Sequence, residues 1–232
     1  MNILAFDTCF ATVSVALRVD RQIVAHLFEP RGGQAERLIP MLHAAMTSAN
    51  FGFKDLDVLA VTVGPGTFTG VRVGVAAAKG LALSTGVKVA GATSLRVVAH
   101  RALDELAGQL REYHMLAVCM DARRDHIYMQ MFDSRGIATC APTALNPQLA
   151  AVLPVGHPVL AVGTGAALFA EWMHRRGVNV DVCRPDLLPQ ASSLADLAES
   201  LSPGPIGPLY LRAPDAKPQA GLADGKTNGR GS

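Results

Sequence analysis

The sequence predicts an α/β fold of two lobes, each built on a mixed sheet flanked by helices. Short segments of alternating or continuous apolar residues, typical of strands, are interspersed with longer helical patterns. The links between the first strands of each half are too short for crossovers, which favours antiparallel pairing there. The order of three strands followed by alternating helices and strands occurs twice in the 232 residues.

The first lobe is expected to span residues 1–107. Its helices share one apolar face each, and Leu38, Met41, Leu42 and Ala45 recur at helical spacing in the first of them. Strands are expected at residues 3–8, 11–19, 22–30, 57–63 and 87–92, and helices at residues 35–50, 69–84 and 95–106. Thr93 or Ser94 can cap the third helix.

The second lobe is expected to span residues 108–212. Strands are expected at residues 115–122, 126–132, 137–140, 158–166 and 178–182, and helices at residues 146–153, 166–177 and 192–201. Residues 213–232 contain Pro, Gly, Ala and polar residues without any period, so we expect a disordered tail.

The composition favours a compact cytoplasmic protein. Half of the residues are hydrophobic and the net charge is only +2, which gives no reason for strong affinity to nucleic acid or membranes. The start, MNILAFDT, lacks the basic region of a secretory signal, and no apolar run is long enough to span a bilayer. Cys9, Cys119, Cys140 and Cys183 are far apart, so we expect reduced thiols.

A glycine-rich turn, GPGTFTG, precedes the second helix. Its spacing matches neither the dinucleotide fingerprint nor the P-loop, which favours a tight turn with Thr67 or Thr69 as the helix cap. Gly70, Gly74 and Ala78 then recur at every fourth position and form a smooth helix face. Another protein could pack closely on this face, or the helix could pack through it on its own sheet.

Two further segments are candidate phosphate loops. Asp7 and Thr8 end the first strand, and a carboxylate there could hold a metal-bound phosphate or simply stabilise a turn. Gly163 and Gly165 follow a buried strand in the second half. The charged segment DARRD, residues 121–125, is either a hairpin turn or a polar functional edge. The histidines and cysteines show no metal-binding spacing, and no catalytic motif is found.

Several motifs identify a resemblance. ILAFDT, ERLIPML, GPGTFTGVRVGVAAAKGLAL, GATSL, MDARRDHIYMQMF and PLYLRAPDAKP occur in this order. Together they closely resemble the TsaB (YeaZ) family of tRNA threonylcarbamoyladenosine (t6A) biosynthesis proteins, from residue 1 to about residue 218. The resemblance implies two RNase H-like lobes of the actin-like ATPase (ASKHA) fold.

The resemblance also implies a function. Members of this family are scaffolds that dock TsaD, the larger paralogue that carries the metal and transfers the threonylcarbamoyl group, and the small ATPase TsaE joins them. No catalytic residue, metal or cofactor is expected in this chain, and contact with tRNA is expected to be indirect or minor. The first two helices would face TsaD, or a second copy in a homodimer. The interface residues would be Leu38, Met41, Leu42, Ala45, Gly70, Val71, Gly74, Val75 and Ala78. Gly74→Leu would then abolish pairing without unfolding the chain.

Two departures bear on this expectation. TsaD-type proteins bind metal through an H-x-x-x-H pair, and Ser94 and Val98 stand at those places here, which argues against metal-dependent catalysis and against a metalloprotease. Many relatives carry His-Ser or His-Thr where this chain has Gln34 and Ala35. The alternative function is an ATP-binding enzyme of the actin-like class, with Asp7, Thr8, Gly163 and Gly165 as its nucleotide loops. In a scaffold the same loops would be vestigial.

Overall fold

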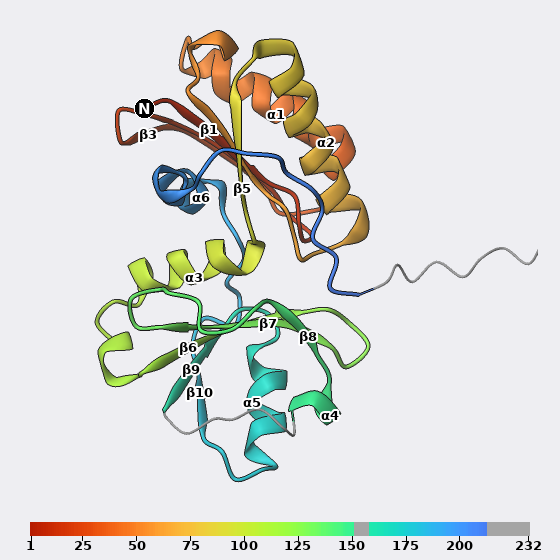
Figure 1. The fold of residues 1–232 in the computed structure, drawn as a ribbon, viewed down its shortest axis with the longest axis vertical. Coiled ribbons are helices and arrows are strands. Elements are labelled where there is room, and N and C mark those ends of the chain that lie inside the picture. Colours follow the sequence, from red (N-terminus) through yellow and green to blue (C-terminus); the bar gives the residue numbers. More distant parts are fainter. Residues whose placement is uncertain (151–157, 213–232) are drawn as a thin grey trace, which may run out of the picture.

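The chain forms two lobes that lie end to end along its longest axis, with helix α3 (Ser94–Glu105) between them (Figure 1). The structure is a computed structural model and describes residues 1–150 and 158–212. The first sheet contains β1 (Ile3–Asp7), β2 (Val13–Val19), β3 (Gln22–Glu29), β4 (Val58–Thr62) and β5 (Lys88–Ala92). The second contains β6 (Met115–Asp121), β7 (Ile127–Asp133), β8 (Thr143–Leu145), β9 (Val159–Val162) and β10 (Val180–Val182). The other helices are α1 (Gln34–Ser48), α2 (Phe68–Thr85), α4 (Pro147–Ala150), α5 (Ala166–His174) and α6 (Ala191–Leu197), with short 3₁₀ turns at Phe53–Asp55, Leu110–Glu112 and Ala198–Ser200.

Both sheets have the same topology. In the first, β1 lies at the centre, antiparallel to β2 and parallel to β4, and the order is β3-β2-β1-β4-β5. In the second, β6 takes the central place, antiparallel to β7 and parallel to β9, and the order β8-β7-β6-β9-β10 repeats that of the first. This repetition confirms the predicted fold of two RNase H-like lobes with mixed sheets.

Helices cover both faces of the first sheet. α1 and α2 lie side by side on one face, and α6 lies on the other (Figure 1). Successive side chains of a strand point to opposite faces. Leu4 and Phe6 therefore pack under α1 and α2, while Ile3 and Ala5 pack against α6. Because β1 is buried on both faces, its first four residues, Ile3 to Phe6, are all apolar.

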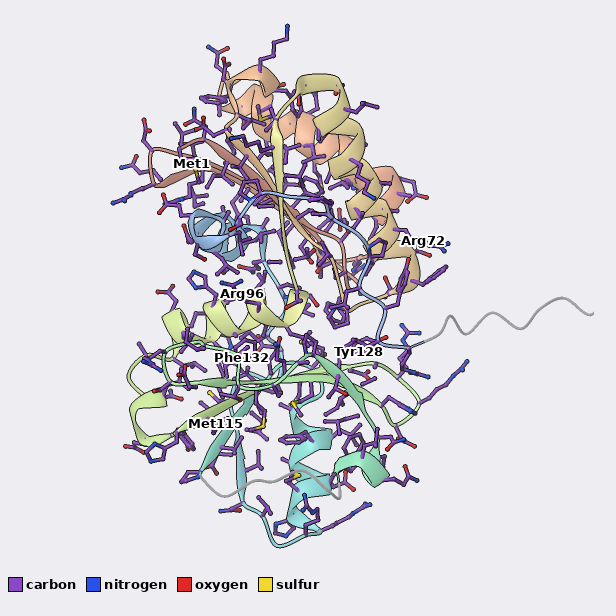
Figure 2. All side chains as sticks on the ribbon, viewed as in Figure 1. Met1, Arg72, Arg96, Met115, Tyr128 and Phe132 are labelled. Carbon is purple, nitrogen blue, oxygen red and sulfur yellow. The ribbon has the colours of Figure 1, made fainter. Side chains whose placement is uncertain are left out.

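α3 forms the layer between the lobes. Its Leu95 and Val98 share an apolar cluster with Leu116 and Phe132 of the second sheet. Side chains fill the space between α3 and that sheet, Phe132 among them (Figure 2). From its other side, Val97 joins the cluster that contains α6 and the first sheet. One helix thus contributes to the cores of both lobes.

Threonines cap α2 and α3, the helices that follow β4 and β5. Thr67 Oγ1 accepts a hydrogen bond from the N–H of Gly70 at 3.2 Å, and Thr93 Oγ1 accepts one from the N–H of Arg96 at 3.1 Å. The sequence allowed Thr67 or Thr69 as the cap of α2, and Thr93 or Ser94 as the cap of α3. The structure shows Thr67 and Thr93. Within the described residues, no helix is long and apolar enough to span a bilayer.

The second lobe departs from the prediction at its third strand. The apolar run at residues 137–140 forms only an isolated bridge between Ala138 and Phe132, and the third strand is β8 instead. Ile137 is 60% exposed, so the apolar character of this run does not reflect burial. The helix expected at residues 146–153 is found as α4, and residues 151–153 lie outside the described residues. The expected tail at residues 213–232 also lies outside them.

The end of the described chain returns to the first lobe. We expected α6 in the second lobe with the rest of residues 108–212, but it covers the first sheet. The following segment, residues 201–212, is here called the C-terminal strap. Gly204 N donates to Val89 O at 2.9 Å, and Leu209 N donates to Val63 O at 2.7 Å. α6 lies on the first sheet because the face of that sheet opposite α1 and α2 is apolar and would otherwise be exposed to water. The lobe boundary near residue 107 stays a prediction.

A buried arginine holds α6 on the first sheet. The side chain of Arg18, on β2, is 6% exposed, and its guanidinium lies 3.2 Å from the carboxylate of Asp196 and 3.1 Å from that of Glu199. The two acids are 51% and 38% exposed, so their carboxylates remain partly hydrated. The desolvation cost therefore falls mainly on Arg18, and its two partners offset that cost.

We predict that Arg18→Met lowers the free energy of unfolding by about 1–3 kcal/mol, because the apolar stem is kept while both ion pairs are lost. Chemical denaturation measures the change. The control is Arg21→Met, since Arg21 is 81% exposed and lies 3.8 Å from the same Glu199. Its effect should stay within about 0.5 kcal/mol. Equal losses in the two variants would show that burial of Arg18 does not matter.

Candidate functional site

Asp7, the last residue of β1, is fully buried. Its Oδ1 accepts hydrogen bonds from Thr62 Oγ1 at 2.5 Å and from the N–H of Cys9 at 3.3 Å, whereas its Oδ2 has no hydrogen-bond partner. Burial raises the pKa of Asp7 to about 6, although these two bonds act in the opposite direction. The carboxyl group is therefore enclosed by the protein and does not face solvent.

The glycine-rich turn closes over the segment that follows β1. Thr67 N donates to Cys9 O at 2.6 Å, and a Cβ added at Gly66 would collide with that same oxygen. Thr8 Oγ1 donates to Gly70 O at 2.7 Å, and a Cβ at Gly70 would collide with Thr8 O. Two backbone segments thus meet directly after Asp7 in the chain. The glycines serve this close approach, in agreement with the tight-turn interpretation.

The second candidate phosphate loop, residues 163–165, has its glycine N–H groups bonded within the protein. Gly163 N donates to Arg184 O at 3.1 Å, and Gly165 N donates to Cys119 O at 2.8 Å. Thr164 Oγ1 accepts a hydrogen bond from the N–H of Asp121 at 3.0 Å. Phosphate loops bind their ligand through backbone N–H groups that point at it. In this loop both glycine N–H groups already have partners inside the protein.

The two cysteines within strands or turns of the sheets, Cys9 and Cys119, and the residues at the places of the metal-binding histidines, Ser94 and Val98, are buried as well. Burial raises the pKa of the Cys9 and Cys119 thiols above their usual range, so neither is a thiolate at neutral pH. Ser94 Oγ donates to Pro65 O at 2.5 Å, and Val98 is fully buried between the lobes. Among the described residues, no three His, Cys, Asp or Glu side chains come together as metal ligands.

The residues expected at a partner interface lie inside the first lobe instead. All nine are buried: Leu38, Met41, Leu42, Ala45, Gly70, Val71, Gly74, Val75 and Ala78. Helical periodicity identified the buried face correctly, but the chain's own β-sheets and helices bury it. A Cβ at Gly74 would lie 2.6 Å from Thr8 Oγ1, so Gly74→Leu would disrupt the lobe itself. These residue assignments are therefore corrected, while docking through α1 and α2 stays a prediction.

The opposite faces of α1 and α2 are the exposed ones. Ile39 on α1 is 55% exposed and Leu83 on α2 is 91% exposed. Ala76 and Gly80 precede Leu83 on α2 and are both exposed, and nothing lies within 4 Å of a Cβ added at Gly80. α2 therefore has a second smooth face, which points away from the sheet.

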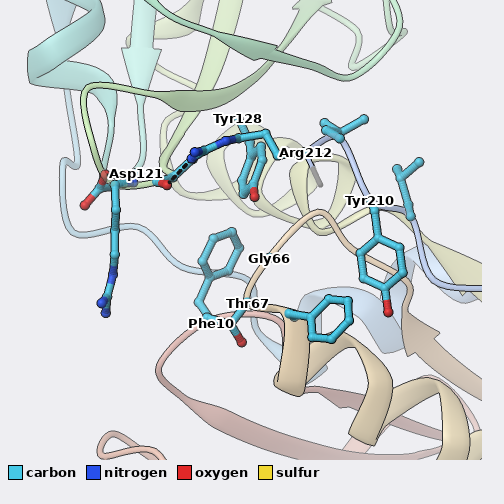
Figure 3. A pocket seen from close by; sticks show the side chains of 12 residues that line it. Phe10, Gly66, Thr67, Asp121, Tyr128, Tyr210 and Arg212 are labelled. Atoms are coloured by element: carbon cyan, nitrogen blue, oxygen red, sulfur yellow. Dashed lines mark hydrogen bonds between the residues drawn. The ribbon is translucent and has the colours of Figure 1, made fainter. Parts of the chain in front are cut away.

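A cavity of about 240 Å³ opens between the lobes (Figure 3). The start of α2, the turn between β6 and β7, and the end of the C-terminal strap line it. Phe10, Tyr128 and Tyr210 contribute aromatic rings. Arg212 spans the opening, and its guanidinium donates to Ala122 O at 2.9 Å. The strap thereby joins the first lobe to the second.

The segment DARRD forms the turn between β6 and β7. Arg123, Arg124 and Asp125 all have left-handed backbone conformations, with φ of 60°, 53° and 53°. Side chains from this turn also line the cavity, Arg123 and Asp121 among them. The segment is therefore the hairpin turn that the sequence allowed, and its role as a functional edge stays a prediction.

An aromatic and cationic cluster holds the strap on α2. Arg72 Nε donates to Tyr210 Oη at 3.0 Å, and the guanidinium carbon of Arg72 lies 3.6 Å from the centre of the Phe68 ring. The rings of Phe68 and Tyr210 are 5.2 Å apart, centre to centre. This cluster fixes one wall of the cavity.

Gln34 has a defined role in this structure. Its side-chain amide donates to Phe10 O at 2.6 Å and so joins the start of α1 to the segment after β1. A glutamine thus fills the position at which many relatives were expected to carry histidine. Ala35 is exposed and makes no comparable contact.

The comparisons with known proteins decide the family. A family model described as "TsaD: tRNA N6-adenosine threonylcarbamoyltransferase" matches residues 33–204. The "tRNA threonylcarbamoyladenosine biosynthesis protein TsaB" of Bacillus subtilis is 30% identical over 178 residues, which cover 74% of each chain. This chain belongs to the TsaB (YeaZ) family.

Two further relatives show how much of the TsaB-family chain is shared. An uncharacterized protein of Mycobacterium tuberculosis is 34% identical over 230 residues, covering 94% of this chain and 95% of its own. The solved structure of YeaZ from Pseudomonas aeruginosa is 28% identical and covers 86% of this chain and 92% of its own, with a TM-score of 0.72. The similarity therefore includes both lobes.

Sequence reasoning missed the cavity of this TsaB-family chain. Its lining comes from residues 10, 66–68, 121–123, 128 and 209–212, most of which are far apart in the sequence. No periodic pattern connects such segments. The motif PLYLR was noticed only as part of the resemblance, and its Tyr and Arg were the available signal.

We predict that Gly70→Ala destabilises the fold by about 1–3 kcal/mol, because the added methyl group collides with the Thr8 carbonyl oxygen. Gly80→Ala is the matched control on the same helix. Gly80 has free space around it, so alanine should stabilise the helix by about 0.5–1 kcal/mol. Thermal or chemical unfolding of the two variants gives both values. A change in unfolding free energy of the same sign in both variants would contradict the close approach of the glycine-rich turn to the segment after β1.

We predict a distinctive pH dependence for Asp7→Asn. The pKa of Asp7 in the folded protein, about 6, lies above the unfolded value of 3.8, so the folded state binds the proton more tightly. The buried group therefore costs stability at neutral pH, and this cost diminishes as the pH falls from about 6 to about 4. Relative to the parent chain, Asp7→Asn should gain about 2 kcal/mol more at pH 7.5 than at pH 4.5.

Unfolding by urea at the two pH values measures this difference. The difference in unfolding free energy between variant and parent is compared at the two pH values. Any effect of the amide that does not depend on pH cancels in this comparison. Asp104→Asn, on the exposed side of α3, controls for the change in net charge. A gain that does not change with pH would show that Asp7 is not perturbed by burial.

Proposed function

We propose that this chain is a non-catalytic scaffold subunit of the t6A synthesis machinery, which docks and supports the transferase TsaD. Membership of the TsaB family supports a role in the t6A pathway. Relatives in Escherichia coli, Haemophilus influenzae and Bacillus subtilis are each named "tRNA threonylcarbamoyladenosine biosynthesis protein TsaB". The matching family model is described by the transferase activity of TsaD, so the two proteins share a domain.

The observation that carries the scaffold role is the closure of the glycine-rich turn over Asp7. An actin-like ATPase would need a carboxylate accessible to a metal-bound phosphate. Here Thr67 N bonds directly to Cys9 O, and both glycine N–H groups of residues 163–165 have protein partners. Ser94 and Val98 stand where TsaD-type proteins were expected to have their metal-binding histidines, and both are buried. These contacts favour the scaffold over an ATP-binding enzyme.

The exposed faces of α1 and α2 form the docking surface in this proposal. They lie side by side on the outside of the first lobe (Figure 1). Ala76, Gly80 and Leu83 recur at helical spacing on α2, and Ile39 lies on α1. Small residues allow a partner helix to approach closely, and the two large apolar side chains would be buried on docking.

The remaining assignments follow from the family. In this proposal TsaE joins the pair formed with TsaD, and the same helix faces form a homodimer when TsaD is absent. In this proposal the protein acts in the cytoplasm, where the tRNA that TsaD modifies is found. No metal or cofactor belongs to this chain, since the chemistry is that of TsaD.

We predict that Ala76→Arg prevents pairing with TsaD while leaving the chain folded. The arginine would extend from an exposed position, so the core is not disturbed, but it would hold the two helix surfaces apart. Size-exclusion chromatography with light scattering, on each variant mixed with TsaD from the same organism, measures the pairing. We expect a one-to-one complex for the parent chain and separate proteins for Ala76→Arg.

The matched control is Ala167→Arg. Ala167 is an exposed helical alanine on α5 in the second lobe, so this variant adds the same charge and size elsewhere. It should pair as the parent chain does. A complex that forms equally well with Ala76→Arg would remove α2 from the docking surface, and no complex with the parent chain would overturn the proposed function.

A further inference from the structure

The cavity between the lobes gathers aromatic residues that are scarce in this chain. The 232 residues include only eight Phe, three Tyr and one Trp. Four of these line the one cavity, namely Phe10, Phe68, Tyr128 and Tyr210. They come from four separate segments of the chain, so local sequence does not explain their clustering.

The cavity is also positively charged. Arg123 and Arg212 line it, and among the described lining residues Asp121 is the only acid. Asp121 Oδ1 accepts a hydrogen bond from the N–H of Arg123 at 2.7 Å, which uses part of its acceptor capacity in the turn itself. The guanidinium of Arg212 donates to the carbonyl oxygen of Ala122 at 2.9 Å, which positions this side chain at the cavity. Arg72 Nε donates to the hydroxyl group of Tyr210 at 3.0 Å.

Aromatic rings interleaved with arginines are the chemistry that binds unpaired nucleotides. Each base presents a π face that stacks on a Phe or Tyr ring, and arginine holds the phosphate. At about 240 Å³, the cavity is smaller than the roughly 300–1,000 Å³ of pockets that enclose a drug-sized ligand. It therefore suits one nucleotide of a longer strand, whose neighbours would lie outside.

We propose that this cavity binds one unpaired nucleotide of an RNA strand, with the base on the aromatic rings and the phosphate on Arg123 and Arg212. The site is separate from the two candidate phosphate loops, because Asp7, Thr8, Gly163 and Gly165 do not line it. The inference rests on the proposed role in tRNA modification. It adds a direct RNA contact, away from the faces of α1 and α2 that dock TsaD.

Fluorescence anisotropy with a labelled single-stranded RNA heptamer tests this on the full chain. The parent should bind saturably, and Arg123→Gln should weaken binding about tenfold and lower the dependence on salt by the equivalent of one phosphate contact. The matched control is Arg135→Gln, since Arg135 is also an exposed arginine in a turn of the second lobe but does not line the cavity. It should bind as the parent does.

Two competitors identify the source of the nucleotide. Unlabelled single-stranded RNA should displace the heptamer, whereas a blunt RNA duplex of the same sequence should not, because its bases are already stacked. AMP, which carries the same base and phosphate chemistry, should compete only weakly. Tight binding of AMP with no binding of RNA would overturn the assignment to RNA.

Two other results would also overturn the inference. One is the absence of saturable RNA binding, and the other is an equal loss in Arg123→Gln and Arg135→Gln, which would indicate general attraction to charge. Pairing with TsaD is measured separately by chromatography, and Arg123→Gln should retain it. A chain that pairs with TsaD but binds no RNA would contradict this inference alone and leave the proposed function intact.

Discussion

The contact between the glycine-rich turn and the segment after β1 determines much of the first lobe. It brings Thr67 N to Cys9 O and leaves no room for a side chain at Gly66 or Gly70. Because α2 begins at this turn, the contact fixes where the helix starts and which face it turns to the sheet. The face with Gly70 and Gly74 is buried, so the face with Ala76 and Gly80 points outward.

The same contact encloses one candidate site and leaves another open. It encloses Asp7, the residue at which a metal-bound phosphate would be expected, in the core of the lobe. Yet it leaves open a cavity next to the turn, lined by Phe10 and by the C-terminal strap. The strap crosses from the first lobe to the carbonyl of Ala122 in the second. The cavity between the lobes thus has a shaped and charged surface, whereas the candidate phosphate loops are filled by protein contacts.

Much of the fold could be predicted from the sequence, because strands and helices have periods of their own. Both halves were expected as three antiparallel strands followed by alternating helices and strands, and the structure confirms this order. The run at residues 137–140 misled because Ile137 is apolar but exposed. The position of α6 could not be predicted, since it depends on which sheet has an uncovered face and on the pairing of Arg18 with Asp196.

The functional surfaces were harder to predict for a physical reason. The periodicity of α1 and α2 shows that residues such as Leu38 and Val71 are buried, but it does not show what buries them. Only the structure distinguishes the chain's own sheets and helices from a partner. The cavity depends on contacts between residues as far apart as Arg72 and Tyr210, which no local pattern contains. The resemblance, by contrast, identified the family correctly, because it rests on motifs that extend over most of the chain.

The central claim is that closure of the glycine-rich turn leaves Asp7 unable to serve a metal-bound nucleotide. Calorimetric titration of the isolated chain with Mg²⁺–ATP, beside the Asp7→Asn variant, tests it most directly. The account predicts no binding that depends on Mg²⁺ or on Asp7. Saturable, Mg²⁺-dependent binding by the parent chain, lost in Asp7→Asn, would contradict it and favour an active ATP-binding protein.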